Sequence, residues 1–378
     1  MAYVPTTFGF PLMHLEPGER RCFLPRLVAT LAAAGATQIV VEEGYGEPMG
    51  VPTHAYVDAS PVVKTGTYED CFAQDVVVQV RCPPDEALRT IRPDALLVAM
   101  LHFPTRPGRV ATLSALAVGC ISLDSIVDDL GHRMVENMRG VGWYGVRAAV
   151  RELARTHRRF ESPGRGPLRA TILGAGAVAG HAIRACTEFG DPELHRRVAA
   201  RRVLGFEVTV VDYDTTWHEN TMLARLEQTD LLIDATARHD QTQPVIPNEW
   251  VEALPQHAVI LDLAADPYDF SLVPPHLKGI EGVPQGTLDQ YVFGVDDPAY
   301  DLMDSRIDTR RRRTSLSCYS WPGVEPRDCM EVYSRQLGPV LEMLLLRPVE
   351  DWDVTSGHFV ERAVARAELG RWRQEHGR

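Results

Sequence analysis

The chain has 378 residues, of which 45% are hydrophobic and 24% charged, and a formal net charge of −12 at pH 7. This composition is typical of a globular protein, and the length suits two domains better than a single core. The acidic balance argues against sequence-independent binding to nucleic acid or to an anionic membrane, because both need a basic surface.

The cysteines and the apolar runs exclude further classes of protein. The seven cysteines are odd in number and contain no Cys-x-x-Cys pair, which argues against a disulfide framework and a zinc site, so no metal is expected. No signal-peptide pattern and no run of roughly 18 apolar residues is present, so we expect a cytoplasmic protein with reduced thiols. The basic run 306–315 is interpreted first as a solvated loop and second as a contact to a cofactor phosphate.

Strand-like and helix-like segments alternate through the first part of the chain. Helical spacing at 23–35 ends on a glycine, and a second short helix is expected at 109–119. Strands are expected at 37–43, 75–84, 94–103 and 120–126. Such alternation predicts a parallel sheet covered on both faces.

A long helix is expected at 131–160, followed by the Pro- and Gly-rich loop "ESPGRGP", which is typical of a domain boundary. Beyond the loop the alternation restarts and predicts a second parallel sheet, with strand-like segments at 168–176, 206–212, 229–237 and 257–265. The segments 326–348 and 356–378 have the pattern of two amphipathic helices. Because two helices are too few for a domain, we expect them to pack onto the first one.

The segment "RATILGAGAVAGHAIRACTEFG" carries the pattern Gly-x-Gly-x-x-Ala between a strand and a helix. The first glycine permits a tight turn, the second lets a pyrophosphate approach the backbone, and the helix N-terminus attracts its charge. The alternative is a glycine-rich turn with no ligand. The residues expected to bind a dinucleotide here are Gly174, Gly176, Ala177, Val178 and Ala179.

Asp212 ends the next strand, where an acid could hold the ribose hydroxyls. Its distance from the loop exceeds the usual spacing of about 20 residues, and "DPELHRRVAARRV" is interpreted as an insertion that accounts for the difference. An acid at this position repels a 2′-phosphate, so NAD is expected as cofactor and NADP is less favoured. We predict an α/β fold with two Rossmann-like doubly wound parallel-sheet domains and a cleft between them. The substrate domain is expected at 1–131 plus 322–378, and the NAD-binding domain at 132–321.

With these segments placed, the chain resembles the alanine dehydrogenase, transhydrogenase and saccharopine dehydrogenase superfamily over nearly its whole length. "GFPLMHLEPGERRCFLP" is similar to the family's opening and matches its arginine to Arg20, with Arg21 a close rival. "MLHFP" matches the strand end that carries the family's active-site histidine, here His102. "ILDLAADP" is similar to the segment beside the nicotinamide, which implies that Asp262 contacts the cofactor and that Asp266 belongs to the catalytic site.

Two features resemble the NAD-dependent, L-lysine-forming saccharopine dehydrogenase branch. "SLDSIVDDLGHRMVENMRGVGWYGV" is similar to an element that implies an acidic site residue at Asp124 and a substrate-carboxylate arginine at Arg133. "EPRDCMEVYSRQLGPVLEMLL" is similar to the branch's carboxyl-terminal helix. In one departure, Arg81 in "QVRCPP" occupies the position of the family's lysine. Arginine stays protonated and cannot be a general base, although it can grip a carboxylate with two hydrogen bonds.

The expected function is an NAD-dependent oxidation of a CH–NH bond in an N-substituted amino acid, with saccharopine or a related lysine conjugate as the leading substrate. His102 suits the proton transfers at neutral pH, and the base work falls to it alone or is shared with Asp124, unless the substrate differs from saccharopine. Arg20, Arg81 and Arg133 would neutralise substrate carboxylates. Structural roles remain open for Arg20 and Arg133 as surface ion pairs, for Asp124 as a cap and for Asp262 in shaping a loop.

Three alternatives remain open. One is an alanine-dehydrogenase-type enzyme for a simple amino acid, and another is an NADPH-using reductase that makes opine-like products. The third is a catalytically silent NAD-binding sensor or partner protein, which the Arg81 departure favours and the presence of His102 and Asp266 disfavours. The expected partner is a small amino-acid substrate, with no nucleic acid and no membrane, in a monomer or a homodimer.

Overall fold

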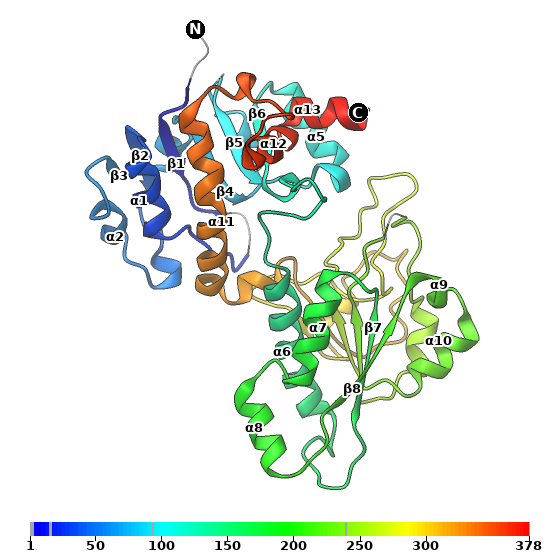
Figure 1. Ribbon diagram of the computed structural model, residues 1–378. Helices are drawn as coiled ribbons and strands as arrows, with labels where there is room; N and C mark the ends of the chain where they lie inside the picture. The colour runs from blue at the N-terminus through cyan, green and yellow to red at the C-terminus, as the bar shows by residue number, and fades with distance from the viewer. Residues whose placement is uncertain (1–3, 15–16, 93, 239, 378) are drawn as a thin grey trace. The chain divides into compact units, whose positions relative to one another are not determined.

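The computed structural model describes residues 4–14, 17–92, 94–238 and 240–377. The chain divides into two compact units, of which unit 1 comprises Met1–Asn137 and Glu325–Arg378, and unit 2 comprises Met138–Val324 (Figure 1). Each unit is built around its own six-stranded sheet. Unit 1 is therefore assembled from both ends of the chain.

The sheet of unit 1 has the strand order β3-β2-β1-β4-β5-β6, and every neighbouring pair is parallel. Its strands are β1 Thr7–Phe10, β2 Gln38–Glu42, β3 Val63–Gly66, β4 Val76–Arg81, β5 Leu96–Met100 and β6 Gly119–Ser122. Its helices are α1 Pro25–Ala33, α2 His54–Val57, α3 Tyr68–Phe72, α4 Asp85–Leu88, α5 Pro107–Ala115, α11 Pro326–Leu346, α12 Phe359–Arg366 and α13 Leu369–His376.

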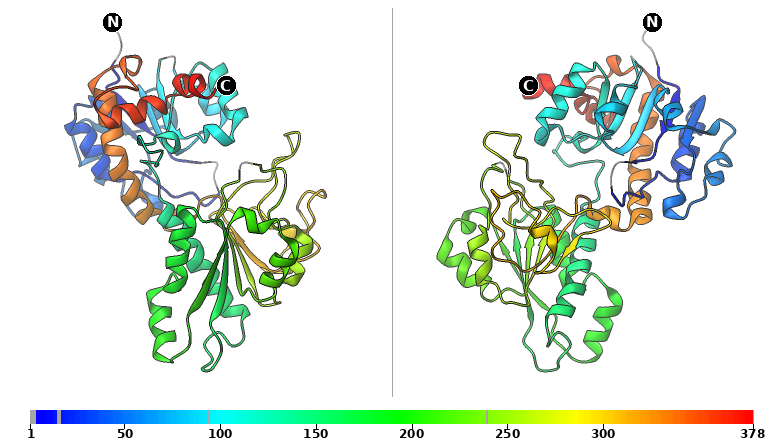
Figure 2. Two further views of the ribbon diagram at one scale, coloured as in Figure 1. Left: turned by 45° about the vertical axis from the view of Figure 1, so that its right-hand side comes forward. Right: turned by 180° about the vertical axis from the view of Figure 1, so that it is seen from behind.

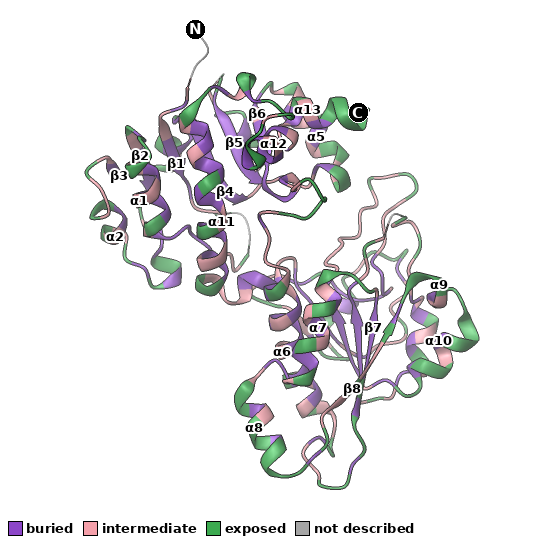
Figure 3. Cartoon of the chain, viewed as in Figure 1, coloured by how far each residue is buried: buried purple, intermediate pink, exposed green. Residues whose placement is uncertain are grey.

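Both faces of this sheet are buried, as Figure 3 illustrates. Along β4, Val76 and Val78 belong to one core with Leu337 of α11, whereas Val77 belongs to a second core with Trp372 of α13. Successive residues of a strand point to opposite faces, so this run of valines fills both layers. Helices α1 and α11 contact each other over the face that carries Val76 and Val78.

Unit 2 has the strand order β11-β12-β10-β9-β7-β8, which is parallel except for the β11–β12 pair. Its strands are β7 Leu168–Leu173, β8 Phe206–Val211, β9 Leu231–Asp234, β10 Val259–Asp262, β11 Val292–Phe293 and β12 Thr314–Ser317. Its helices are α6 Met138–Thr156, α7 Ala177–Thr187, α8 Pro192–Ala200, α9 Tyr213–Thr216 and α10 Glu219–Leu226. Helix α8 lies within the segment interpreted as an insertion.

The glycines of α6 have a packing role. A Cβ on Gly142 would lie 2.8 Å from the backbone nitrogen of Ala182 in α7, and a Cβ on Gly145 would lie 2.3 Å from Leu263 beyond β10. Helices α6 and α7 therefore contact each other at close range, and Figure 2 shows them side by side. Glycine lowers intrinsic helix stability by about 1 kcal/mol relative to alanine, and this close packing is what it allows in return.

The topologies confirm the predicted fold class of two doubly wound parallel-sheet units. Unit 1 has the strand order of the Rossmann fold, 3-2-1-4-5-6, and its connections reverse direction between β1 and β4. In unit 2 the reversal falls between β7 and β9. Ligands of such sheets bind outside the carboxyl ends of the strands at this reversal point. Arg81 ends β4, and Gly174 follows β7.

Two helix predictions need correction. The helix expected at 131–160 begins only at Met138, because Gly131 has a positive φ of 83° and Arg133 is paired with Val127 in an isolated bridge. The helix expected at 356–378 is two helices, α12 and α13. Ala367 accepts a hydrogen bond from the Ser122 amide, which interrupts the helix, and Glu368 then caps α13.

Candidate functional site

His102 follows β5 at the carboxyl edge of the first sheet, one residue after Leu101. Its backbone is left-handed, with φ 53° and ψ 47°. This conformation costs an L-residue about 1–2 kcal/mol, so neighbouring groups must hold it. The imidazole is 39% exposed, which leaves it accessible to a ligand.

Asp124, just beyond β6, holds both the backbone and the ring of His102. Its Oδ1 accepts the His102 amide at 3.1 Å, and its Oδ2 lies 3.2 Å from His102 Nδ1. The Ser122 hydroxyl donates to the same Oδ1 at 2.9 Å and accepts the Leu101 amide at 3.2 Å. Strands β5 and β6 are neighbours in the sheet, so adjacent strand ends build this arrangement.

Charge in this pair determines which ring nitrogen is available. Burial of Asp124 favours its neutral form, but hydrogen bonds and charge from His102, together with the charge of Arg133, hold its pKa well below the usual 3.8. An ionised carboxylate can only accept hydrogen bonds, so His102 Nδ1 must be the donor. When the ring is neutral, its Nε2 carries no proton and can take one from a ligand.

Arg81 lies next to β5 in the register, paired with Met100, and is half-buried. Its charge reaches Glu19: burial raises the pKa of that carboxyl, while Arg21 and, to a smaller extent, Arg81 bring it below its usual range. Arg21 itself is buried and donates to both Glu19 oxygens, at 2.8 and 2.5 Å. This bidentate pair occupies the guanidinium of Arg21, whereas Arg20, its predicted rival, is exposed.

Arg133 is exposed and lies in the segment between β6 and α6. Burial raises the pKa of Tyr333 in α11, and the charges of Arg21 and Arg133 both oppose that rise. Arg133 also acts on Asp124, as described above. His102, Asp124 and Arg133 therefore share one electrostatic neighbourhood, which Tyr333 connects to the Glu19–Arg21 pair.

In unit 2 the glycine loop has the predicted strand–turn–helix context. Gly174 follows β7 with a φ of +90°, and a Cβ there would lie 2.8 Å from the carbonyl oxygen of Ala235. Gly176 caps α7 with a φ of −76°, and a Cβ there would meet nothing within 4 Å. Gly174 is thus required by the backbone, whereas at Gly176 the lack of a side chain leaves space at the helix N-terminus. Ala177 and Val178 begin α7, and Ala179 is buried.

Asp212 directly follows the neighbouring strand β8 and is exposed. Its side chain accepts the Tyr213 amide at 2.8 Å and so begins α9. Tyr213 at the start of this short helix and Trp217 just after its end are 68% and 79% exposed, with ring centroids 6.2 Å apart. Two such large exposed rings beside a candidate ribose-binding acid were not singled out from the sequence.

A row of polar residues crosses the carboxyl edge of the second sheet. In register, Leu173 of β7 lies beside Asp234, Asp234 beside Asp262, and Asp262 beside Ser317. Asp262 is buried and accepts from the Ala265 amide at 2.8 Å, Lys278 Nζ at 2.6 Å and the Ser317 hydroxyl at 2.9 Å. These contacts shape the loop after β10, and cofactor contact by Asp262 remains a prediction.

Asp266 and Asp234 differ in their surroundings. Arg238 Nη2 contacts Asp266 at 3.0 Å, which fixes the carboxylate that was expected in the catalytic site. Asp234 is buried, and its Oδ1 accepts the Thr236 amide and hydroxyl at 3.0 and 2.7 Å. Burial and the nearby Asp262 raise the pKa of Asp234 to about 6. Asp234, Arg238 and Lys278 were missed from the sequence, although Asp234 could have been found as a strand-end acid.

The arginines of the basic run 306–315 form ion pairs within the run and with other parts of unit 2. Arg306, Arg310, Arg311 and Arg312 pair with Asp304, Asp308, Glu252 and Asp301, respectively. Arg313 is buried and donates to backbone carbonyls, including that of Leu254 at 2.6 Å. These contacts give the run a structural role, which corresponds to neither sequence interpretation in full.

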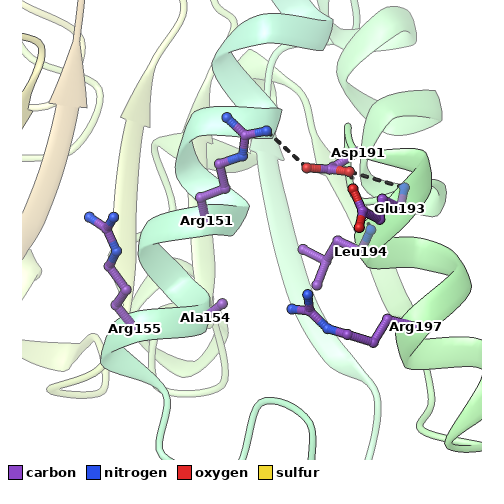
Figure 4. Close-up of a pocket in the computed structure, with 7 residues that line it drawn as sticks. All are labelled: Arg151, Ala154, Arg155, Asp191, Glu193, Leu194 and Arg197. Atoms are coloured by element: carbon purple, nitrogen blue, oxygen red, sulfur yellow. Dashed lines mark hydrogen bonds and ion pairs between the residues drawn. The ribbon is translucent and has the colours of Figure 1, made fainter.

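A pocket of about 320 Å³ lies between α6 and α8 (Figure 4). Its lining residues are Arg151, Ala154, Arg155, Asp191, Glu193, Leu194 and Arg197. Arg151 pairs with Asp191 at 2.9 Å, and Arg197 pairs with Glu161 at 2.7 Å. Arg151 and Arg197 thus link α8 to α6 and to the segment after it, whereas Arg155 pairs with Glu152 within α6. None of the predicted site residues is among the lining.

Comparison with known proteins finds similar sequences for part of the chain. Residues 15–138 match the family model "Alanine dehydrogenase/PNT, N-terminal domain". Over 286 residues, 68% of the chain, it is 22% identical to the NAD(P) transhydrogenase subunit alpha of Haemophilus influenzae. The match spans 55% of that relative's length.

Solved structures show the same fold over nearly the whole chain. An L-alanine dehydrogenase is similar with a TM-score of 0.68 and 19% identity, covering 96% of this chain and 94% of that one. A transhydrogenase from Sinorhizobium meliloti is similar with a TM-score of 0.61 and 16% identity, covering 90% of this chain and 94% of that one. The chain thus has the two-domain alanine dehydrogenase fold. Among the described residues, no helix is long and apolar enough to cross a bilayer.

Proposed function

We propose that this protein is an NAD-dependent oxidoreductase that acts on the CH–NH bond of an amino acid. The observation that carries the proposal is the His102–Asp124 pair, in which an ionised, buried carboxylate fixes the imidazole with Nε2 available. The match of residues 15–138 to the alanine dehydrogenase N-terminal domain covers both residues. A positioned histidine of this kind is the usual proton acceptor in such oxidations.

The residues of unit 2 fit a dinucleotide. Open space at Gly176, the N-terminus of the 11-residue helix α7 and the exposed Asp212 on the adjacent strand together suit a pyrophosphate and a ribose. Tyr213, directly after Asp212, and Trp217, at the end of α9, offer ring faces on which the adenine could stack. The acid at position 212 favours NAD over NADP, because it would repel a 2′-phosphate.

The bound nicotinamide supplies the hydride acceptor, and the chain supplies the proton transfers. As the substrate Cα–H leaves as hydride, the amine N–H proton passes to His102 Nε2, and a C=N bond forms. Asp124 stabilises the resulting imidazolium through Nδ1. Once the imidazolium has released this proton to solvent, the neutral ring can accept a proton from the water that adds to the imine carbon. Arg81 cannot replace it as a base, since a guanidinium stays protonated.

Two substrate classes are in competition. The fold and the N-terminal family match favour a simple amino acid, as in alanine dehydrogenase. Arg20, Arg81 and Arg133, all on unit 1, favour a substrate with several carboxylates, such as saccharopine. The Glu19 charge beside Arg81 offsets part of this positive charge, so we place the simple amino acid first and the lysine conjugate second.

The deciding experiment follows the absorbance of the reduced nicotinamide with NAD or NADP against alanine, other small amino acids, saccharopine and further lysine conjugates. Turnover of a small amino acid with NAD supports the first class, and turnover of saccharopine supports the second. NAD binding with no turnover of any amine overturns the enzymatic proposal and favours a sensor. Absence of NAD and NADP binding overturns the proposal altogether.

A further inference from the structure

Three metal-ligating side chains gather at the amino edge of the second sheet, opposite the glycine loop. His157 follows the end of α6, Asp230 immediately precedes β9, and His257 precedes β10. Each offers one ligand atom, and these three atoms lie within 4.8 Å of one another. All three residues are half-buried. The sequence had given no reason to group them, because they are far apart along the chain.

Backbone contacts fix the positions of these residues. The Arg169 amide donates to Asp230 Oδ2 at 2.8 Å, so that the carboxylate is anchored to the start of β7. The Asp230 carbonyl accepts the Val259 amide of β10, and the His257 carbonyl accepts the Thr156 hydroxyl at 2.7 Å. The three segments are therefore tied together before any ligand is considered. Such anchoring lowers the conformational cost of binding.

The geometry is close to that of a transition-metal site. His257 Nε2 lies 2.7 Å from Asp230 Oδ1, and the two imidazoles lie perpendicular at 85° with centroids 4.4 Å apart. Ligand atoms around a tetrahedral zinc ion lie about 3.3 Å apart, given metal–ligand distances near 2.0–2.1 Å. His257 Nε2 and Asp230 Oδ1, now 2.7 Å apart, would have to separate by about 0.6 Å to reach that spacing, which small side-chain rotations allow.

A proton and a metal ion compete for the same nitrogen of an imidazole, so each ligand nitrogen must be unprotonated when the ion binds. When an ion binds at His257 Nε2, it takes the place of the proton shared with Asp230, and that proton moves to Nδ1. His157 Nδ1 accepts the Arg159 amide at 3.2 Å, a long hydrogen bond that an ion at this nitrogen could replace.

Solvent access completes the site. His157 and Asp230 line a pocket of about 390 Å³, which also contains Arg159, Arg165, Arg169 and Glu227. Arg165 donates to the carbonyls of Phe160 and Gly166, each at 2.7 Å. The pocket leaves room for one or two waters to complete the coordination. Two imidazoles, one carboxylate and water suit Zn²⁺, Co²⁺, Ni²⁺ or Cu²⁺ rather than Mg²⁺ or Ca²⁺.

We propose that His157, Asp230 and His257 bind one divalent transition-metal ion, with zinc as the leading candidate. The ion clamps the end of α6 to the starts of β9 and β10. It lies at the edge of the sheet away from the glycine loop, so its role is structural and does not depend on the proposed function.

The test measures binding of ZnCl₂ by titration calorimetry and of CoCl₂ by its visible d–d absorption. The full chain is used in a Cys82→Ser background, because Cys82 is the half-buried thiol and the other six are buried. We expect one ion per chain, a Co²⁺ spectrum without thiolate charge transfer, and a higher thermal midpoint with zinc. Since even outer partners of a metal site change affinity by about 10–100-fold, His157→Gln or His257→Gln should weaken binding at least about tenfold.

The matched control is His14→Gln, because His14 Nε2 also contacts a carboxylate, that of Glu42, but has no second imidazole in that pair. It should bind zinc like the parent. Thermal unfolding without metal checks that each variant is folded, and a variant that is not is replaced by the corresponding His→Asn. Absence of saturable one-to-one binding by the parent overturns the proposal. Equal zinc affinity in the His14, His157 and His257 variants overturns it as well.

Discussion

His102 and His132 form the same contact with an aspartate in different surroundings. In both pairs Nδ1 lies 3.2 Å from a carboxylate oxygen. Each aspartate also accepts the amide of its histidine, but the Asp124 side chain is 3% exposed and the Asp128 side chain 35%. Water screens the carboxylate of the second pair but hardly reaches that of the first, so only His102 is expected to be fixed for proton transfer.

This contrast gives a controlled test of the catalytic assignment. Replacing His102 with glutamine should lower turnover at least about 100-fold, the usual scale of general acid–base catalysis, with NADH affinity unchanged. His132→Gln should stay within a few-fold of the parent. Steady-state kinetics and NADH titration of both variants provide the measurement. Comparable activity in the two variants would remove His102 from the mechanism.

Asp234 should make stability depend on pH in the sense opposite to most carboxylates. Its pKa is raised from 3.8 to about 6 by burial and by Asp262. Between these values the folded state holds a proton that the unfolded state has lost, so stability falls as pH rises from about 4 to 6. The loss is at most about 3 kcal/mol, at about 1.4 kcal/mol per pKa unit.

Asp234→Asn keeps an oxygen for the Thr236 contacts and abolishes the ionisation. The variant should therefore gain stability relative to the parent as pH rises from 4 to 7, measured as the free energy of unfolding in urea at several pH values. Asp214→Asn, at an exposed position, is the control and should follow the parent. A constant difference between Asp234→Asn and the parent across this range would contradict the assignment.

Trp217 offers a further residue-level test. If its exposed ring stacks on the adenine, Trp217→Ala should weaken NADH and ADP-ribose by about 5-fold or more, given about 1–3 kcal/mol per stacked base. Reduced nicotinamide mononucleotide, which has no adenine, should bind the variant and the parent equally. Titration calorimetry with the three ligands makes the comparison, and equal losses for all three would point to a folding effect instead.

At the scale of elements, the two glycines of the turn between β7 and α7 have different roles: the backbone conformation requires one, and the expected ligand requires the other. Gly174→Ala puts a Cβ against Ala235 at a positive φ and should cost about 1–3 kcal/mol of stability. Gly176→Ala meets open space, so it should leave stability unchanged and weaken NADH about tenfold, or about 1.4 kcal/mol. Thermal unfolding and NADH titration distinguish the two effects.

Gly180→Ala, farther along α7, is the matched control because its Cβ would also meet nothing within 4 Å. This substitution should leave NADH affinity unchanged and stabilise the helix by up to about 1 kcal/mol. If Gly176→Ala bound NADH as tightly as Gly180→Ala, the turn would not be a pyrophosphate site.

The sequence predicted those elements whose hydrophobic pattern is self-contained. Strands β2, β4, β5, β8, β9 and β10 were expected close to where they lie, as were α1, α5 and α11. Strands β3 and β12 were missed because charged or hydroxylated residues dominate them, and the two-residue β11 offers no periodicity. The break between α12 and α13 depends on a contact with β6, which no local pattern reveals.

Those residues of the candidate site that directly follow an apolar strand could be predicted from the sequence. His102, Arg81 and Asp212 each follow an apolar run, so their placement at a carboxyl edge could be inferred. Lys278 lies in irregular chain and reaches Asp262 only through the fold. The pairing of Arg21 with Glu19 likewise depends on the burial of both side chains, which cannot be inferred from their spacing in the sequence.

At the scale of the whole molecule, unit 1 depends on the carboxyl-terminal helices. Leu337, Leu341 and Leu344 of α11 belong to the same core as Val28 and Val76. Each buried leucine contributes about 1.5–3 kcal/mol, whereas a whole domain is stable by only about 5–15 kcal/mol. A chain that ends at Val324 should therefore lose unit 1 as a folded body.

Hydrogen exchange with mass spectrometry can check this expectation. In the shortened chain, amides of β1, β4 and β5 should lose protection, while those of β7, β9 and β10 keep it. A chain that ends at His376 is the control and should exchange like the parent. Retained protection in β4 and β5 would mean that the first sheet is stable without α11.

The discontinuity of unit 1 also has a consequence for synthesis on the ribosome. The strands of its sheet emerge first, but α11, which completes their core, is made only after the whole of unit 2. At roughly 5–20 residues per second, the nascent strands wait on the order of ten seconds or longer with apolar surface uncovered. The middle of the chain is thus ready to fold before its beginning, and the parts translated first complete their fold last.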